Sequence, residues 1–363
     1  MAGIQDYKCP CCGAPLVFDG TTQNLKCDSC GNEFSVENLR QLQEGEEGAS
    51  GQSKFDWESY EPRSYEDTGD VDLSSYSCPS CGAEIVGDET LGATVCPYCG
   101  NATIVKGTFE GTLRPDYVIP FKIDKKRAME CFEQASQQAP FLPNEFKDKK
   151  KIEEMAGVYV PFWMFDCDCD ANISYNAQRT SVWSDSRYNY EKIDFYKLIR
   201  AGKVGFANIP VDASQKTDND YMEAVEPFDY SAAVDFNTAY LSGYLADKYD
   251  VSSEDSIGRA NERVKNSTES VFASTTGGYM SVIPDSSRVI FSGGKIRYAL
   301  LPVWMLNIKY MDTMYKYVIN GQTGKVAGQY PISKGKRNAY FFKIFGITLA
   351  IAAAAAYAFL KWF

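Results

Sequence analysis

The sequence predicts an α+β protein with two N-terminal four-cysteine zinc ribbons, an internally duplicated antiparallel α+β central domain and one C-terminal transmembrane helix. Three observations support this fold class. Eight cysteines form two copies of one spacing, a group of Pro/Trp motifs occurs twice within residues 108–332, and residues 344–360 carry no charge. With 363 residues, 44% of them hydrophobic, the chain is long enough for a sizeable core and one or two satellite domains.

The two ribbons are predicted at residues 1–40 and 77–107. Each contains a Cys-x-x-Cys pair, a gap of fourteen residues and a second Cys-x-x-Cys pair. A Cys-x-x-Cys turn presents two thiolates, and the glycine after each pair can adopt positive φ and let backbone amides approach the sulfurs. Two such pairs complete a tetrahedral site, so we expect two structural zinc ions. Their ligands are Cys9, Cys12, Cys27 and Cys30 in the first ribbon and Cys78, Cys81, Cys96 and Cys99 in the second.

Four protein thiolates fill the coordination shell of zinc, which leaves no position where the metal could activate water. The alternative is a set of disulfides or redox Cys-x-x-Cys motifs, but redox motifs occur singly on a βαβ scaffold. Cys11 lies between two ligands and could substitute for one, so the choice among Cys9, Cys11 and Cys12 stays open. Residues 14–26 and 83–95, between the pairs, are expected to form short hairpins.

The ribbons carry few basic residues. Lys8 and Lys26 are nearly the only bases in the first, and the second has none until Lys106. Nucleic-acid binding would need an electropositive face with interleaved aromatic residues. Zinc ribbons occur in nucleic-acid-binding and protein-binding proteins alike, so the fold does not identify a partner. The charge pattern favours protein binding over nucleic-acid binding.

Residues 41–76 hold ten acidic and only two basic residues, a large part of the net charge of −11. The segment is also rich in Ser and Gly and poor in aliphatic residues. Such a composition repels phosphates and is typical of a solvated spacer. We therefore expect an acidic flexible linker between the ribbons.

The chain contains no histidine, which excludes His-containing zinc sites, Ser-His-Asp triads and the commonest general base. Twelve cysteines would suit a disulfide framework in a small secreted domain, but the chain is large, and its first residues lack a basic region followed by an apolar core. We therefore expect reduced cysteines in a cytosolic setting.

The apolar run at residues 344–360 is near the lower length limit for a membrane-spanning helix, and Tyr340, Phe341 and Phe342 extend it if Lys343 reaches the interface. A buried or surface-lying helix is the alternative, but the run is uninterrupted and not amphipathic. Basic residues concentrate in the preceding juxtamembrane segment, 333–343. The positive-inside rule keeps that side in the cytoplasm. The expected location is the cytoplasmic membrane, with the bulk of the chain in the cytoplasm.

The central domain, residues 108–332, contains a repeated order of short motifs. A Pro-Phe sequence followed by an amphipathic stretch occurs at residues 119–132 and again at 226–236. Each copy is followed by a Pro-x-Trp-Met strand, at 161–164 and 302–305, which predicts two related α+β modules. The second copy ends in a hairpin whose turn is residues 320–324, and residues 195–213 are expected to add another antiparallel strand.

Two further motifs could suggest chemistry. In FDCDCD, residues 165–170, a strand would place Cys167 and Cys169 on one face with Phe165, and the aspartates on the other. Buried cysteines under a solvated acidic face are favoured over a metal or redox site. Neither residues 292–298 nor 320–326 have the spacing of a phosphate-binding loop, so no nucleotide is expected. The sequence contains no catalytic constellation.

The doubled ribbons, the strings FEGTLRPDYVIPFKID, YVPFWMFD, AYLSGYLADKYDV, LLPVWMLNIKY and NGQTGKVAG, and the terminal apolar run together resemble a bacterial membrane family labelled TFIIB-type zinc ribbon-containing proteins. Some members carry the name of a primosomal replication-restart helicase, but this chain lacks the helicase motor. The resemblance implies a role at the cytoplasmic membrane beside SPFH-domain and phage-shock-type (PspA-like) proteins. It implies the same eight cysteine ligands and no catalytic residue.

We therefore expect a non-enzymatic membrane-anchored adaptor that recruits protein partners to the membrane surface. The alternative is a membrane-tethered nucleic-acid-binding regulator of replication or transcription. An enzyme is the third possibility, and a ligand bound in the central domain would be needed to support it.

Overall fold

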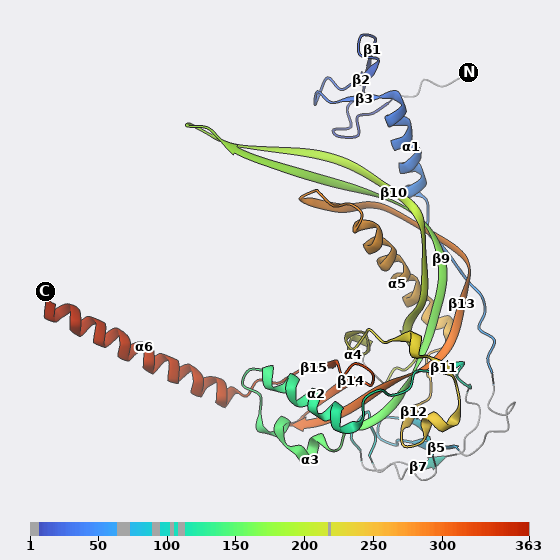
Figure 1. The fold of residues 1–363 in the computed structure, drawn as a ribbon, viewed down its shortest axis with the longest axis vertical. Helices are drawn as coiled ribbons and strands as arrows, with labels where there is room; N and C mark the ends of the chain where they lie inside the picture. The colour runs from blue at the N-terminus through green and yellow to red at the C-terminus, as the bar shows by residue number, and fades with distance from the viewer. Residues whose placement is uncertain are drawn as a thin grey trace. The chain divides into compact units, whose positions relative to one another are not determined.

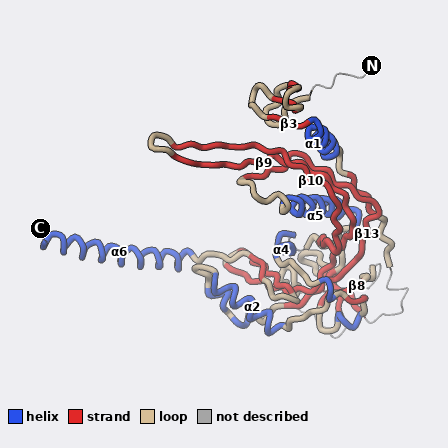
Figure 2. The backbone as a smooth tube through the Cα atoms, turned by 45° about the horizontal axis from the view of Figure 1, so that its top comes forward, coloured by secondary structure: helices blue, strands red, loops and turns tan. Residues whose placement is uncertain are grey.

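The computed structural model describes residues 7–63, 73–88, 95–101, 105–107, 113–216 and 219–362. The chain forms two compact units, each assembled from three separate segments (Figures 1 and 2). Unit 1 comprises Met1–Tyr60, Met164–Val211 and Ile257–Ile296, and unit 2 comprises Glu61–Trp163, Asp212–Ser256 and Arg297–Phe363. The predicted central domain therefore contributes to both units, because its long strands run from one into the other.

Unit 1 begins with the first ribbon, a three-stranded antiparallel sheet. Its strands are β1 (Val17–Asp19), β2 (Asn24–Lys26) and β3 (Glu33–Ser35). β1 and β2 pair antiparallel, which confirms the predicted hairpin. β3 passes directly into helix α1 (Val36–Ser50), where the Ser35 side chain caps the helix by accepting a hydrogen bond from the Asn38 N–H.

The acidic segment differs from the predicted flexible linker. Residues 41–50 belong to α1, which buries Leu39 and Ala49, and residues 54–57 form strand β4 (Lys54–Trp57), paired parallel with a later strand. The Trp57 ring packs edge-on against Phe165 and Phe291 at centroid distances of 4.9 and 4.6 Å. A few apolar residues thus anchor residues 41–57, while Glu44, Glu47 and Asp56 are exposed. Residues 64–72 of the predicted linker lie outside the described residues.

Three long strands organise unit 1: β9 (Ala156–Ser184), β10 (Asn189–Asp212) and β13 (Ser281–Tyr310). β9 pairs with both β10 and β13, and a short turn joins β9 to β10, where the Asp185 N–H donates to the Tyr188 carbonyl (2.9 Å; Figure 2). Helix α5 (Ser253–Ala273) buries Val264 and Thr268. The predicted strand at 195–213 is confirmed as part of β10.

Unit 2 contains the second ribbon and its neighbours. β5 (Leu73–Ser77) pairs antiparallel with both β6 (Glu84–Asp88) and β7 (Val105–Gly107), so this module begins inside the predicted linker. Of the hairpin predicted at 83–95, β6 is the first strand, and residues 89–94 lie outside the described residues. β6 continues antiparallel to β12 (Leu245–Asp247).

The central sheet is mixed, which corrects the prediction of an antiparallel domain. β12 runs parallel to β9, and β8 (Tyr117–Val118) runs parallel to β13, whereas β11 (Val234–Asp235) is antiparallel to β8. β14 (Thr313–Asn320) is antiparallel to β13 and to β15 (Val326–Gly328), which confirms the hairpin predicted at the end of the domain. Parallel pairs arise because residues distant in sequence meet through long connections.

The core of unit 2 lies between the β13–β14 hairpin and helix α2 (Lys125–Gln138). Phe132 of α2 is fully buried against Tyr317, and Trp304 packs in the same cluster. The remaining short elements of this unit are η2 (Asn144–Lys147), α3 (Lys149–Ile152), α4 (Asn219–Ala224), η3 (Tyr230–Ala232) and η4 (Thr238–Leu241).

The turn at residues 320–324 is held by a buried amide. The Asn320 Nδ2 group donates to the carbonyls of Val225 and Pro227 (2.9 and 3.2 Å), and its Oδ1 accepts from the N–H groups of Gln322 and Thr323. Asn320 is buried, and both ends of its side-chain amide have hydrogen-bond partners. These bonds connect the turn to residues 225–227. Both Pro-x-Trp-Met motifs lie within long strands, β9 and β13; the duplication itself stays a prediction.

Candidate metal centres and the C-terminal helix

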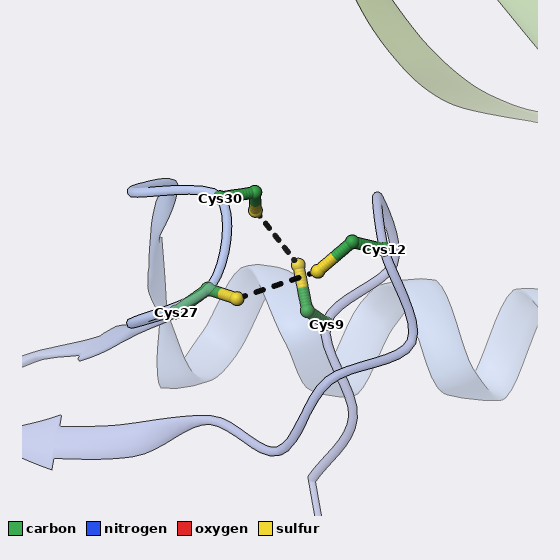
Figure 3. A group of neighbouring side chains, drawn as sticks. All are labelled: Cys9, Cys12, Cys27 and Cys30. Atoms are coloured by element: carbon green, nitrogen blue, oxygen red, sulfur yellow. Dashed lines mark hydrogen bonds between the residues drawn. The ribbon is translucent and has the colours of Figure 1, made fainter.

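The first four-cysteine group brings together the predicted ligands of ribbon 1. Each Cys-x-x-Cys turn is closed in the same way: the Gly13 N–H donates to the Cys9 carbonyl and the Gly31 N–H to the Cys27 carbonyl, both at 2.8 Å. Both glycines have φ near +73° and +74°, a conformation that side chains disfavour. The turns face each other, so that all four sulfurs converge (Figure 3).

The second group repeats this geometry in unit 2. The Gly82 N–H donates to the Cys78 carbonyl (2.8 Å) and the Gly100 N–H to the Cys96 carbonyl (2.9 Å), again with positive φ at both glycines. Its four sulfurs, from Cys78, Cys81, Cys96 and Cys99, also lie within 4.8 Å of one another. The structure therefore assembles all eight predicted ligands into two groups of four.

The spacing of the sulfurs fits a tetrahedral metal. Four sulfurs about 2.3 Å from a central zinc ion lie about 3.8 Å from one another. The Cys9–Cys30 and Cys12–Cys27 Sγ atoms are 3.6 and 3.5 Å apart, and the Cys78–Cys99 and Cys81–Cys96 pairs are 3.6 and 3.7 Å apart. These distances exceed a disulfide bond of about 2.05 Å by far. Each group could hold one metal ion, and the all-thiolate donor set fits zinc.

The thiols of ribbon 1 differ in acidity: the pKa values of Cys9 and Cys12 are raised, whereas that of Cys30 is lowered. Donation from the backbone N–H of Asn32 lowers the pKa of Cys30 to about 6. The Asn32 side chain reaches the same sulfur, with Nδ2 at 3.3 Å. Only deprotonated sulfur binds zinc, so Cys30 reaches the metal-binding form at a lower pH than Cys9 and Cys12 do.

The remaining cysteines are not members of these groups. Cys11 is exposed and is not a member of the ribbon 1 group, whose ligands are Cys9 and Cys12. Cys167 and Cys169 are buried, with Phe165, on one face of β9, while Asp168 is exposed. The predicted buried face of the FDCDCD segment is confirmed; on the other face Asp168 and Asp170 are exposed, whereas Asp166 is half-buried and accepts a hydrogen bond from the Asn208 N–H (2.6 Å).

Ribbon 2 is supported by residues that the cysteine spacing did not reveal. The Asn307 Nδ2 group of β13 donates to the Pro97 carbonyl (2.6 Å), inside the second Cys-x-x-Cys pair. Behind this turn, Tyr98 and Asp247 are buried, and Ser214 Oγ donates to Asp247 at 2.6 Å. Burial raises the pKa of Asp247 to about 7, and burial followed by the nearby Asp247 carboxylate raises the pKa of Tyr98. Ribbon 2 thus rests on the sheet of unit 2.

Comparison with known proteins identifies the family. The chain is 35% identical over 345 residues to the uncharacterized protein YdjG of Bacillus subtilis (strain 168), and the match covers 95% of both chains. The chain belongs to the YdjG family. No family model and no solved structure matches it.

In this member of the YdjG family, the chain's last helix is α6 (Lys334–Trp362). Residues Lys334–Tyr357 have a mean hydropathy of 1.8 over the most apolar window, and none of that window is buried. The helix is long and apolar enough to cross a membrane. It begins ten residues before the predicted span, so the basic segment 333–343 is helical apart from its first residue.

Proposed function

We propose that this protein is a non-enzymatic scaffold, anchored in the cytoplasmic membrane by α6, that recruits protein partners to the cytoplasmic surface. The observation that carries the proposal is the combination of two closed four-cysteine groups with an exposed apolar helix on one chain. With zinc bound, four thiolates leave no coordination position for water or substrate. The metal's part is then to stabilise two small modules that other proteins contact.

The end of the β9–β10 hairpin supports partner binding. It carries six exposed large apolar side chains, Val182, Trp183, Tyr188, Tyr190, Ile193 and Phe195. Trp183 and Tyr190 stack across the two strands with centroids 5.5 Å apart. Exposed clusters of aromatic side chains are typical of interaction surfaces. Side chains that stay in water do not add hydrophobic free energy to the folded state, whereas they can be buried by a partner.

Under the positive-inside rule, the basic residues before the apolar part of α6 support a cytoplasmic location for the two units. A reducing compartment agrees with that orientation, since the four-cysteine groups bind metal only as thiolates. From the resemblance to TFIIB-type zinc ribbon-containing membrane proteins, SPFH-domain and PspA-like proteins of the membrane-stress response are the partners we expect.

Crosslinking in intact membranes, followed by affinity purification in detergent, tests the proposal. We expect a defined protein partner to be recovered with the full chain. Recovery of no stable protein partner would refute the scaffold role. Binding of the full chain to DNA or RNA with a steep salt dependence would instead support the nucleic-acid-binding alternative, because phosphate contacts release counterions.

A further inference from the structure

The first turns of α6 are fixed to the body of unit 2. The Ser333 N–H donates to the Phe141 carbonyl (2.9 Å). The Lys336 ammonium group donates to the Leu142 carbonyl (2.6 Å) and to Asn144 Oδ1 (2.7 Å). The helix therefore leaves unit 2 beside residues 141–144 in a defined direction and is not joined to it by a free linker.

Aromatic contacts reinforce this attachment. The Tyr340 ring of α6 lies 5.3 Å from the Phe141 ring. Phe146, in the next turn of the same segment, is fully buried against Tyr315 and Tyr317 of the unit 2 core. Residues 141–150 are thus held between the core and the start of α6, and Figure 1 places α3 and the beginning of α6 on this part of unit 2.

Exposed basic side chains gather at this place. We name six of them the basic collar: Lys147, Lys149 and Lys150 from the 141–150 segment, and Lys334, Arg337 and Lys343 from α6. No carboxylate lies within 4.0 Å of their charged groups in the part of the chain that the structure describes. Residues 334–363 contain no acid, although Glu145 and Asp148 accompany the three lysines of the first segment. This local excess of positive charge contrasts with the net charge of −11 of the whole chain.

The position of the collar suits a membrane surface. Residues 334–343 rise about 15 Å along a helix, and Tyr340 is a residue type enriched at the membrane interface. The apolar core of a bilayer then begins close to residue 344, which leaves Lys334 and Arg337 near the headgroup layer. Lys147, Lys149 and Lys150 follow directly after residues 141–144, which Lys336 and Tyr340 of α6 contact.

We propose that the basic collar binds the phosphate groups of anionic phospholipids in the leaflet from which α6 enters the membrane. This inference rests on the membrane anchoring that the proposed function includes. Because the contacts of Ser333 and Lys336 fix the helix direction, the collar presents its charges to the headgroups together. The surface would hold unit 2 against an anionic membrane and select anionic over zwitterionic lipid.

The test uses the full chain reconstituted into liposomes of phosphatidylcholine mixed with phosphatidylglycerol, followed by mild detergent extraction and quantification of the lipids retained with the protein. We expect the retained lipid to be enriched in phosphatidylglycerol. The variant K147E/K149E/K150E should lose about tenfold or more of that preference, since each basic residue near a membrane surface contributes about fivefold. Higher salt should weaken the preference as well.

A matched control reverses three exposed lysines of unit 1, in K54E/K203E/K295E, with the same change of net charge. Its lipid preference should equal that of the original chain. Equal retention of the two lipids by the original chain, or an equal loss of preference in both triple variants, would overturn the inference. Flotation of the same liposomes after a high-salt wash separates the two proposals: chain that does not float refutes anchoring, whereas chain that floats without lipid preference refutes only the collar.

Discussion

At the scale of single residues, cysteines and glycines have different roles in the two ribbons. The cysteines supply the metal-binding sulfurs, and the four glycines, Gly13, Gly31, Gly82 and Gly100, turn the chain so that each pair of sulfurs faces the other. A glycine at positive φ avoids the steric cost that a side chain would meet there. The hydrogen bond from glycine N–H to cysteine carbonyl is the same in all four turns. Replacing one cysteine at a time can therefore show which sulfurs bind the metal.

The choice between Cys11 and the ribbon 1 ligands gives the first prediction. Cys27→Ser removes a sulfur from the group and should lower the zinc content from two ions to about one per chain, because three thiolates bind zinc far more weakly. Metal analysis of the purified full chain measures this. Cys11→Ser should keep two ions, since Cys11 is exposed outside the group. Loss of zinc from the Cys11→Ser chain would contradict the assignment.

The buried carboxyl of Asp247 predicts a pH dependence of stability. Its pKa is about 7 in the folded chain, above the ordinary value of 3.8, because burial disfavours the charged form. The folded state then binds the proton more tightly than the unfolded state. The free energy of unfolding therefore falls as pH rises from about 4 to 7, by at most about 1.4 kcal/mol for each step of one in pH.

Asp247→Asn should remove this dependence and stabilise the chain at pH 8, with Ser214 still able to donate to the amide oxygen. Denaturant unfolding of both chains between pH 5 and pH 8 is the measurement. Zinc binding by the thiolates also varies with pH, but that variation is common to both chains and cancels in the difference. Identical pH profiles would show that the carboxyl does not titrate in this range.

At the scale of elements, α1 depends on a close approach to strand β10. A Cβ atom at Gly45 would lie 2.5 Å from Cδ1 and 3.0 Å from Cγ2 of Ile199, and the stiff χ1 torsion of this β-branched residue holds Cγ2 in place. Lys197 of the same strand pairs with Glu46 at 3.3 Å. Gly45 is therefore needed for the packing of α1 against β10. From the acidic, Gly-rich composition alone, it would be interpreted as part of a flexible segment.

Gly45→Ala should therefore speed amide hydrogen exchange in α1, because the clash outweighs the better helix propensity of alanine. The matched control is Gly258→Ala in α5, where a Cβ would meet no atom within 4 Å. That change should slow exchange in α5, since alanine gains about 1 kcal/mol over glycine inside a helix. Slower exchange in α1 of the Gly45→Ala chain would refute the close packing.

The β9–β10 hairpin gives a prediction about partner binding. Replacing Trp183 and Tyr188 with serine should reduce the partner recovered by crosslinking about tenfold or more, because large aromatic side chains contribute most of the energy of an interface. Both side chains are at least half exposed, so the fold and the zinc content should not change. Val271→Ser and Met311→Ser, which remove exposed apolar side chains elsewhere, serve as the control pair. Equal partner recovery from both double variants would remove the hairpin from the proposed interface.

For the whole molecule, the features that could be predicted are those fixed by local sequence. The cysteine spacing identified every member of both groups, and the apolar run identified α6, because each pattern determines its own geometry. Alternation in FDCDCD likewise gave the buried face of β9. The fold of residues 41–57 could not be read locally, because Trp57 is ordered by Phe165 and Phe291, more than a hundred residues away. Local sequence also could not identify Asp247 and Asn307 as supports of ribbon 2, because both lie on strands distant from it in the sequence.

The whole chain makes one more prediction, about the separate roles of α6 and the two units. A chain that ends at Tyr340 keeps the contacts of Lys336 and the ring contact with Phe141 but loses the apolar part of α6. None of that apolar window is buried, so both units should remain folded with two zinc ions. After lysis and a high-salt wash, which screens the basic collar, the shortened chain should leave the membrane pellet while the full chain stays. Fractionation with metal analysis of both chains is the measurement. A shortened chain that stays with washed membranes would mean that another surface anchors the protein. A shortened chain that loses zinc would mean that α6 helps to fold the units.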